Sequence, residues 1–561
     1  MSDEMTPATP TEASADNSKI AKATAGISVL TAAGFATGLI IKMILSRLLG
    51  TTVTANAYNH VYRLTQDIFR SWDKLVRPTF LPALALERER VGHENARQFT
   101  NSFINVQVLL LGLLTALLMI FPRLSLQYFT KFQQVEATSL ATRFLVCLAP
   151  AVLFLSLAVT GYMLLNSYKR FHLAAFGDHV FVKLVPLVAL VMLWYFFGIY
   201  ALIAGVVFGT AAKLVLYGWG LRRELKHYRL RVQLVSPAMK KMLLLMLPLA
   251  VGVVVSFVRN RFEDNLLTQV QGGSAATIVP YSKALVDVPI QLFPVAMSIA
   301  VFPFLSDYFL RKQHKELFAV LGKGLRIIFL VFLPLTVGLM ILARPVIDVA
   351  FGGGKFTAQA VTLTARSLQF YAVGYVVFGL EILLLQFFYA AHNTLAPTLT
   401  GIVTSTLQIA VLYLTVGRFG IITFTMAYSA SKAVKVAILL VLLVGVYPHI
   451  SLWLPMLKRT GVALLKVAVT TAVMGAVVYL LSPVVEGWLR PGLDNFLLQV
   501  LEPLLPQKWS VTDAVRMIVG MIHLAVVAGV GALVFAVGVH VLGVEEWRQA
   551  LDWVKRKLKR R

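Results

Sequence analysis

The hydrophobic positions of this sequence form long blocks that recur along nearly the whole chain. Each block holds about twenty residues, the length that a helix needs to cross a hydrocarbon core of roughly 30 Å at 1.5 Å per residue. Apolar helices of soluble proteins are shorter and show a polar face every few residues. The pattern therefore predicts an all-α polytopic membrane protein with about fourteen transmembrane helices.

We place these spans near residues 23–49, 56–84, 104–121, 140–166, 173–197, 199–221, 240–268, 277–306, 326–350, 362–390, 397–416, 420–446, 461–482 and 514–542. The second span is the weakest, because Arg63, Asp67, Arg70 and Lys74 give it too many charges for a helix that faces lipid. We expect this helix to line a polar space.

The spans group into segments along the chain. Residues 1–18 are polar and acidic and are expected to form a disordered cytoplasmic tail. An N-terminal six-helix lobe over 19–222 and a C-terminal six-helix lobe over 223–447 follow. Residues 448–543 hold two extra spans with a long outer loop, in which 484–505 is expected to form an interfacial helix. The tail 544–561 is basic and amphipathic, as in helices that lie on an anionic leaflet.

A short internal echo favours the two lobes. Tyr58 is followed by Pro82 in FLPAL, and Tyr281 is followed at nearly the same spacing by Pro303 in VFPFL. Each pair stands in the second predicted span of its lobe. Repeated halves of this kind are typical of secondary transporters, whose substrate site lies near the midplane between the halves.

The high apolar content of the chain changes how its net positive charge is interpreted. The chain is 58% hydrophobic and only 14% charged, with a mean hydropathy of +0.76 and a net charge of +26. In a soluble protein that charge would indicate nucleic acid as partner. Here the Lys and Arg residues gather in alternate loops, which by the positive-inside rule lie in the cytoplasm. We therefore expect the bacterial inner membrane as location and the lipid bilayer as partner, both termini cytoplasmic, and no nucleic acid.

Basic residues inside the spans are the candidates for binding. Ionisable groups cost several kcal/mol in hydrocarbon, so each is a functional hypothesis. Arg and Lys together suit a phosphate-bearing substrate, because guanidinium groups hold phosphate oxygens in a bidentate fork. The alternative for RNRFED at 259–264 is a charge cluster that neutralises itself. The candidate substrate-binding residues are Arg47, Arg63, Arg70, Arg259, Arg261 and Lys283.

Three acidic residues could couple transport to a cation or simply pair with bases: Asp264, Asp287 and Glu381. Glu381 stands in the apolar run FGLEILLLQFF with no partner nearby in sequence. The single cysteine, Cys147, excludes a disulfide framework and a cysteine-based metal site. Neither an HExxH zinc motif nor a GxSxG nucleophile motif is present, so we expect no catalytic residues, no metal, no cofactor and no enzyme activity.

Four segments resemble the MviN/MurJ family of lipid II flippases, within the multidrug/oligosaccharidyl-lipid/polysaccharide exporter superfamily. They are YSKALVDVP from Tyr281 running on to FPFLS, FGGGKFTAQAVTLTARSLQFYAVG from Phe351, FFYAAHNTLAPT from Phe387, and LLNSYKRFHLAAF from Leu164. In order and spacing they cover most of residues 150–400. The arrangement of six, six and two spans is also similar to that family.

The resemblance implies a two-lobed carrier with a cationic central cavity that moves undecaprenyl-diphosphate-linked peptidoglycan precursor to the outer leaflet. Spans thirteen and fourteen would then form a groove for the polyprenyl tail. Arg47 matches the Arg before the family's FG turn, Arg70 falls on its LLRR pair, and Asp264 matches its QIN(x)₃D pattern. The N-terminal lobe departs from the family, with Thr37-Gly38 in place of Arg-Asp and ANAY at 55–58 in place of TDAF.

The sequence thus favours a lipid II flippase in which Arg and Lys from the two lobes clasp the diphosphate during alternating access. Its partners would be a polyprenyl-diphosphate-linked glycan and other cell-wall synthesis proteins, and we expect a monomer. A flippase for another polyprenyl-linked glycan, such as an O-antigen or exopolysaccharide unit, is the first alternative. A drug/cation antiporter of the same superfamily and a non-transporting membrane scaffold are the others.

Overall fold

The computed structural model describes residues 33–129, 132, 134–168, 170–226, 228–230, 236–391, 393–447, 450–502 and 511–559. The tail predicted at residues 1–18 lies outside these ranges. Within them the chain folds into helices, and the one bridge of β type joins Gly353 to Phe356 in a tight loop. The predicted all-α polytopic membrane fold is confirmed.

Nine of the described helices are long and apolar enough to cross a membrane, or ten if the bent pair α14 and α15 counts as one span. The other predicted spans also fall on helices. Residues 33–49 form the described part of the first one, and the second is helical but highly charged, as expected. The helix at 182–197 is short, and the eighth predicted span is divided into two helices. The total of about fourteen spans therefore remains a prediction.

The chain divides into two compact units, one formed by the described parts of Met1–Ile41, Ala57–Thr130 and Val135–Phe257, the other by Lys42–Asn56, Lys131–Gln134 and Val258–Arg561. The division near the middle of the chain falls inside a continuous helix, after Phe257, and not at residue 222. Hydropathy shows where a helix crosses the membrane but not which neighbours it packs against. The lobe limits given by sequence remain a prediction.

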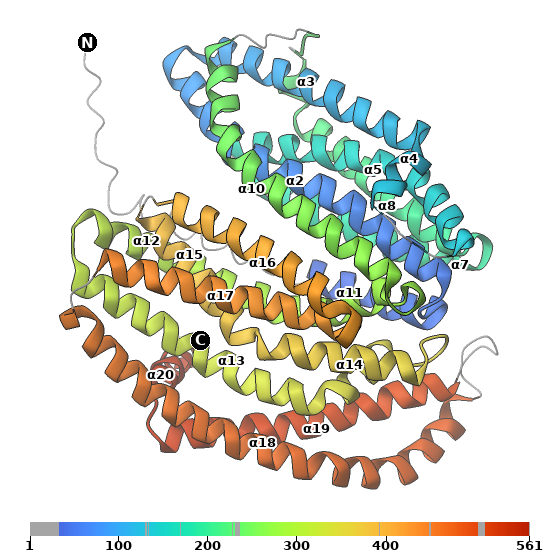
Figure 1. Ribbon diagram of the computed structural model, residues 1–561, viewed down its shortest axis with the longest axis vertical. Coiled ribbons are helices and arrows are strands. Elements are labelled where there is room, and N and C mark those ends of the chain that lie inside the picture. The colour runs from blue at the N-terminus through green and yellow to red at the C-terminus, as the bar shows by residue number, and fades with distance from the viewer. Residues whose placement is uncertain are drawn as a thin grey trace. The chain divides into compact units, whose positions relative to one another are not determined.

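The first unit begins with residues 33–41 and contains most of α2 and the elements up to the middle of α10 (Figure 1). In chain order these are α2 (Val53–Arg90), α3 (His93–Ile120), α4 (Pro122–Phe129), α5 (Val135–Ser167), α6 (Phe171–Phe176), the π-helical turn η1 (Gly177–Phe181), α7 (Val182–Phe197), α8 (Ile199–Gly220), α9 (Arg222–Leu225) and α10 (Pro237–Gln269).

The core of this unit joins α2, α3, α5, α8 and α10. Phe80 of α2 packs against Phe99 and Phe103 of α3, with ring centroids 5.6 and 4.8 Å apart. Tyr217 of α8 is fully buried and donates a hydrogen bond to the carbonyl of Ala174. Gly177 permits this approach, because a Cβ there would lie 2.4 Å from the Tyr217 ring. Aromatic side chains therefore fix the spacing of these helices.

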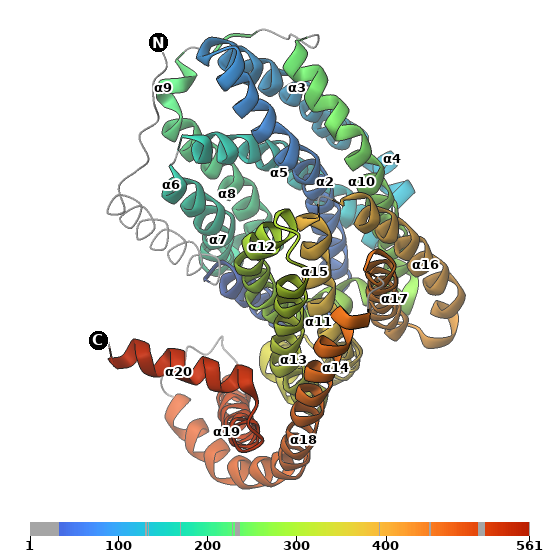
Figure 2. The ribbon, with the colours of Figure 1, turned by 90° about the vertical axis from the view of Figure 1, so that its left-hand side faces the viewer.

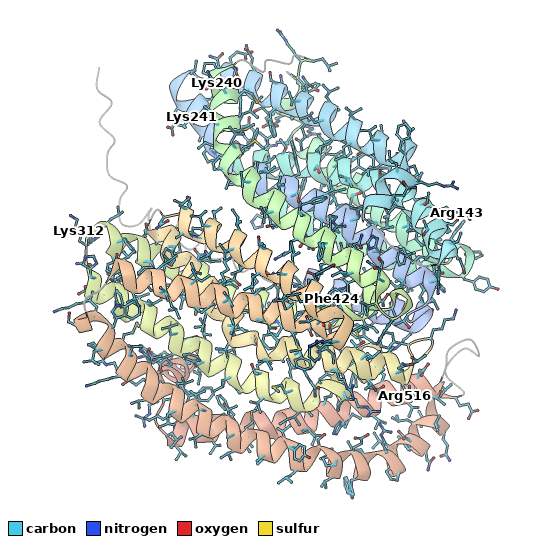
Figure 3. The ribbon with its side chains drawn as sticks, in the orientation of Figure 1. Arg143, Lys240, Lys241, Lys312, Phe424 and Arg516 are labelled. Atoms are coloured by element: carbon cyan, nitrogen blue, oxygen red, sulfur yellow. The ribbon has the colours of Figure 1, made fainter. Side chains whose placement is uncertain are left out.

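The second unit contains the end of α10 and all later elements. They are η2 (Val270–Gly273), α11 (Ala275–Leu292), α12 (Pro294–Leu310), α13 (His314–Phe351), α14 (Ala358–Val373), α15 (Tyr375–Ala390), α16 (Leu395–Phe419), α17 (Ile422–Val446), α18 (Ile450–Leu501), α19 (Val511–Val541) and α20 (Glu545–Lys559). Figure 3 shows Lys312 at one end of this unit's long helices and Arg516 at the opposite end.

Two of the predicted spans are broken. The eighth divides at Phe293 because Pro294 has no N–H to continue the helix, so α12 starts there. The tenth bends by 44° at Gly374. The sequence echo is accordingly carried by one helix in the first unit, where Tyr58 and Pro82 share α2, and by two in the second. Broken helices in a membrane are tolerated where they surround polar space.

Helix α18 corrects the expectation of a separate interfacial helix. Residues 484–501 continue the preceding span without interruption, in a helix of 52 residues that curves along its length (Figure 1). Three prolines inside it, Pro455, Pro483 and Pro491, account for bends without ending it. The sequence suggested an outer loop because proline and glycine stand at 483–492, but the flanking apolar residues maintain the helix.

Helices α13, α18 and α19 pack side by side through an apolar cluster that includes Leu342, Val467 and Val527. Glycines let the helices approach closely: a Cβ at Gly531 of α19 would lie 2.7 Å from the Val478 side chain of α18. Figure 2, which looks nearly along α19, shows α20 running across its end. Trp547 of α20 packs against the same apolar cluster.

Candidate functional site

Ionisable side chains inside the second unit gather on α10, α11, α15 and α17. Each of these helices is otherwise apolar or small-sided in this region, so the charges are costly unless they are paired. The residues involved are Arg259, Arg261, Glu263, Asp264, Lys283, Asp287, Glu381, Lys432 and Lys435. We call them the charged network.

The α10 members pair locally. Arg261 forms an ion pair of 2.7 Å with Asp264, and the two side chains are only 6% and 1% exposed. Arg259 is half-buried and donates a 2.7 Å hydrogen bond to the side-chain oxygen of Asn260. Its Nε has no hydrogen-bond partner among the described residues. Arg261 therefore resembles the self-neutralised alternative for RNRFED, whereas Arg259 keeps donor capacity for a ligand.

Lys283 of α11 lies beside Asp287 one turn later. The ammonium is 2.8 Å from the carboxylate, and both side chains are only half-buried, at 35% and 42% exposed. The same ammonium lies over the ring of Tyr428 of α17, 5.1 Å from its centroid. A cation placed between a carboxylate and an aromatic face is held in position yet still accessible to a second anion.

Glu381 of α15 has two basic partners on α17. Its Oε1 accepts hydrogen bonds of 2.8 Å from Lys432 and 2.9 Å from Lys435. The three side chains are 8%, 21% and 13% exposed, in that order. Sequence analysis did not single out the two lysines. Their spacing gave the signal, because Tyr428, Lys432 and Lys435 recur at helical intervals on one face of a span.

Hydrogen bonds connect this network across further helices. Gln408 of α16 donates to Glu263 of α10 at 3.3 Å, and Ser431 of α17 donates to the side-chain oxygen of Gln408 at the same distance. Lys432 also lies over the Tyr428 ring that Lys283 faces, 5.6 Å from its centroid. The polar side chains of α10, α11, α15, α16 and α17 are thus linked within one unit.

Arg47 lies elsewhere, against the loop that follows α13. Its Nη2 donates to the carbonyl of Val349 at 3.0 Å and its Nε to that of Gly352 at 3.3 Å. The carbonyl of Val349 belongs to the last turn of α13 and that of Gly352 to the residue that follows this helix, where carbonyls lack partners within the helix. In return the carbonyl of Arg47 accepts a hydrogen bond of 2.9 Å from the N–H of Lys355. In this structure Arg47 caps a helix end.

Arg63 and Arg70 lie on α2 in the first unit. Arg63 is half-buried and Arg70 is exposed. Near them on the same helix, Asp73 forms an ion pair of 2.9 Å with Arg77, and Tyr58 stacks on Tyr62 with centroids 5.7 Å apart. The charged second helix thus carries its own pairs. Their role in binding remains a prediction from the sequence.

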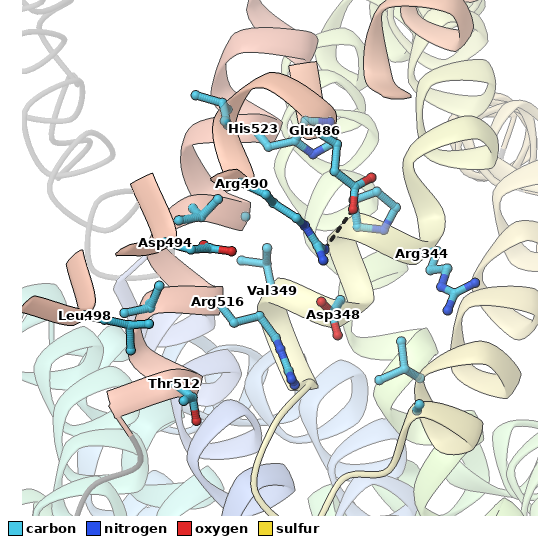
Figure 4. Close-up of a pocket in the computed structure, with 17 residues that line it drawn as sticks. Arg344, Asp348, Val349, Glu486, Arg490, Asp494, Leu498, Thr512, Arg516 and His523 are labelled. Atoms are coloured by element: carbon cyan, nitrogen blue, oxygen red, sulfur yellow. Dashed lines mark ion pairs between the residues drawn. The ribbon is translucent and has the colours of Figure 1, made fainter. Parts of the chain in front are cut away.

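A separate polar cavity of about 580 Å³ lies among α13, α18 and α19 (Figure 4). Its charged lining consists of Arg344, Arg490, Arg516, Asp348, Glu486 and Asp494. Glu486 forms an ion pair of 2.8 Å with Arg490 across one turn of α18. His523, which also lines the cavity, shares a hydrogen bond of 3.2 Å with the Ser482 hydroxyl. Basic and acidic groups balance here, unlike in a site built for one sign of charge.

Metal binding finds no support in the described ranges, where no three His, Cys, Asp or Glu side chains gather closely enough to hold an ion. The family model described as "Lipid II flippase MurJ" matches residues 45–494. The chain belongs to the lipid II flippase MurJ family. Members of this family are multi-pass membrane transporters and not enzymes, which confirms the resemblance drawn from the sequence motifs.

Individual MurJ relatives agree with this assignment. A "Probable lipid II flippase MurJ" of Borreliella burgdorferi is 22% identical over 411 residues, covering 72% of this chain and 79% of the relative. The "Lipid II flippase MurJ" of Burkholderia cenocepacia is 26% identical over 396 residues, covering 66% of this chain and 74% of the relative.

Solved structures show the same fold. "Lipid II flippase MurJ, inward closed conformation" aligns with a TM-score of 0.68 at 18% identity, covering 90% of this chain and 98% of that structure. An inward-facing multidrug resistance transporter of the MATE family aligns with a TM-score of 0.61 at 13% identity, covering 77% and 95%. The MurJ fold is therefore shared with the wider MOP superfamily, and fold alone does not distinguish cargo.

Proposed function

We propose that this MurJ-family chain translocates lipid II, an undecaprenyl-diphosphate-linked peptidoglycan precursor, from the inner to the outer leaflet of the bacterial inner membrane. The observation that carries the proposal is the family match over residues 45–494, which spans the helices that hold the charged network. The partners are this glycolipid, the bilayer and other cell-wall synthesis proteins. The chain is proposed to act as a monomer. The loop charges support a cytoplasmic location of both termini.

Within the charged network, Arg259 and Lys283 are the residues proposed to hold the diphosphate. Both are half-buried, and each has hydrogen-bonding capacity beyond its contact with Asn260 or Asp287. Arg261 is proposed to serve structure, because Asp264 already neutralises it in a buried pair. Arg63 and Arg70 of the first unit are proposed as further phosphate ligands during alternating access.

The charge of the cargo supplies a driving force. Each negative charge carried outward gains roughly 2.3 kcal/mol per 100 mV when the cytoplasm is negative. The emptied cationic site is drawn back by the same field. Asp264, Asp287 and Glu381 each have a basic partner, so their charge is compensated without a metal cation. We therefore propose that these three acids pair structurally, and that the membrane potential drives the cycle.

Complementation tests the proposal. Cells depleted of their own lipid II flippase would express this chain, and lipid II exposed on the outer leaflet would be measured by a periplasmic probe. We expect exposure to be restored by the wild type and lost in Arg259→Gln/Lys283→Gln. The matched control is Arg311→Gln with Lys312→Gln, which removes two cations from an exposed turn between α12 and α13.

Three outcomes would contradict parts of the proposal. Failure of the correctly inserted wild type to expose lipid II would exclude this cargo and favour another polyprenyl-linked glycan. Full activity of Arg259→Gln/Lys283→Gln would exclude the diphosphate role of these residues. Drug efflux without lipid II exposure would indicate an antiporter instead.

A further inference from the structure

A basic cavity lies where α13, α18 and the start of α20 meet in the second unit. It encloses about 280 Å³ and is separate from the charged network. Its charged lining consists of Arg326, Lys458, Arg459, Lys466, Glu545 and Glu546. Basic groups outnumber acidic ones, so the cavity differs from the balanced one beside Arg344.

One basic residue of this cavity is already neutralised by an ion pair. Arg326 of α13 donates from its Nε to a carboxylate oxygen of Glu546 in α20, and the side chains are 13% and 4% exposed. Because this pair is buried and mutually neutral, it does not compensate the other cations. For Lys458, Arg459 and Lys466, Glu545 is the remaining acid among the lining residues.

Among these three cations, Lys466 gives the strongest indication of a missing anionic partner. It is the one charged residue in α18 between Arg459 and Glu486, within a run of apolar and small side chains. It is half-buried, and among the described residues no ion pair or hydrogen bond is formed by its ammonium group, although its carbonyl accepts a hydrogen bond of 3.0 Å from the Thr470 hydroxyl. A lysine in apolar surroundings costs several kcal/mol unless its ammonium reaches polar groups. Its position therefore calls for an anionic partner.

Helical spacing places two of the three cations on one side of α18. Arg459 precedes Lys466 by about two turns, so these two side chains point the same way, whereas Lys458 is rotated by about 100° from Arg459. All three side chains line the cavity. Two turns correspond to roughly 10 Å along the helix axis. The cations of the cavity thus extend from Lys458 and Arg459, expected near the cytoplasmic surface, to Lys466 at the depth where lipid headgroups meet acyl chains.

Helix α20 closes the cavity on the other side. Val544 before it is buried, and Trp547 packs on the apolar cluster of α13, α18 and α19. Gly543 has a φ of +65°, and a Cβ there would lie 2.9 Å from the Arg548 guanidinium. This tight turn sets the amphipathic, basic α20 beside the cations of α18. Such helices lie in the plane of an anionic leaflet.

We propose that this cavity binds the phosphate-bearing headgroup of an anionic phospholipid of the inner leaflet. The ammonium and guanidinium groups that line the cavity would hold the phosphate oxygens, and the acyl chains would lie against the apolar flank of α18. The volume is slightly below the roughly 300–1,000 Å³ typical of pockets that enclose a whole small molecule. It suits a headgroup whose chains remain in the bilayer.

Lipid binding to the full-length protein tests this inference. Phosphatidylglycerol, phosphatidylcholine and inorganic phosphate would each be added to the detergent-purified chain. Native mass spectrometry would count retained lipid, and the unfolding temperature would report binding. We expect phosphatidylglycerol alone to bind and stabilise. Lys458→Gln/Arg459→Gln/Lys466→Gln should weaken its affinity about tenfold or more, because three charge-assisted contacts are lost.

The matched control removes three cations from an exposed turn of the same unit, in Arg311→Gln/Lys312→Gln/Lys315→Gln. This control should bind phosphatidylglycerol as the wild type does. Equal binding by both triple variants, or equal loss in both, would overturn the assignment to the cavity. Stabilisation by inorganic phosphate as strong as that by phosphatidylglycerol would overturn the lipid headgroup as the occupant.

Lys466→Met gives a second readout that does not depend on folding defects. Without lipid it should be at least as stable as the wild type, because an uncompensated charge leaves apolar surroundings. With phosphatidylglycerol it should lose most of the stabilisation. An unchanged lipid effect would exclude Lys466 as a ligand. Because the readout is phospholipid binding, this test can fail or succeed independently of the proposed lipid II transport.

Discussion

In the second unit, Lys432 of α17 donates a hydrogen bond of 2.8 Å to Glu381 of α15, across two helices that pack together. Lys435 donates to the same oxygen at 2.9 Å. Either lysine alone can keep the buried carboxylate compensated. The arrangement predicts that the two lysines back each other up.

This redundancy predicts non-additive stability effects. Lys432→Met and Lys435→Met should each lower the free energy of unfolding only slightly, whereas the double variant should lose about 3–5 kcal/mol because an unpaired carboxylate remains buried. Unfolding in detergent, followed by intrinsic fluorescence, would measure the effect. Adding Glu381→Gln to the double variant should restore most of the loss. Costs that simply add would show that the lysines do not share this carboxylate.

A substitution at Arg47 can distinguish a structural role of this residue from a role in substrate binding. Arg47→Lys keeps the charge but cannot reach both Val349 and Gly352 with its single ammonium in the same geometry. We expect a loss of about 1–3 kcal/mol in unfolding free energy, from carbonyls left without a charged donor. Thermal unfolding and lipid II affinity should be measured together. Weaker lipid II binding at unchanged stability would contradict the structural role and support the predicted substrate-binding role of Arg47.

Two glycines beside Arg47 permit the close approach of its turn to the loop after α13. A Cβ at Gly50 would lie 2.0 Å from the carbonyl oxygen of Lys355, and one at Gly354 would lie 2.2 Å from that of Arg47. Both have positive φ, +60° and +55°. Gly50→Ala and Gly354→Ala should therefore prevent the contact and cost more than the roughly 1–2 kcal/mol of left-handed strain alone.

Gly272→Ala is the control for that pair. Gly272 has a φ of +65° in the same unit, but nothing lies within 4 Å of its Cβ position. The Gly272→Ala variant should show the cost of left-handed backbone strain without any steric clash of the added Cβ. Melting temperatures of the three alanine variants would decide the matter, and equal decreases in all three would mean that the contact adds nothing.

The first unit offers an asymmetric ion pair. Lys213 of α8 contacts Asp178, and their side chains are 3% and 39% exposed. Lys213→Met leaves an acid that solvent can reach, so we expect a loss below about 1 kcal/mol. Asp178→Asn leaves a buried ammonium and should cost about 3–5 kcal/mol. Chemical denaturation of both variants would measure the order, and a larger loss in Lys213→Met would contradict it.

The sequence predicted the helices well because transmembrane length and apolarity are local properties. The high charge of α2 follows directly from its residues, and the helix breaks occur at Pro294 and Gly374, two residue types that interrupt helices. Packing partners are not local. Lys432 and Lys435 were overlooked because each looks like an ordinary cation in its own span, and only the fold brings them to Glu381. The same holds for Arg47, whose contacts with the carbonyls of Val349 and Gly352 are visible only in the fold, and its role in substrate binding remains a prediction.

The position of Arg47 has a consequence for biosynthesis. Its carbonyl partners Val349 and Gly352 follow it in the chain by 302 and 305 residues. At a synthesis rate of about 5–20 residues per second, the guanidinium waits roughly 15–60 s for those partners to emerge. We expect the first helix to reach the bilayer before these carbonyls are synthesised. Water, lipid headgroups or the insertion machinery would then have to supply hydrogen-bond acceptors for Arg47 until α13 is made.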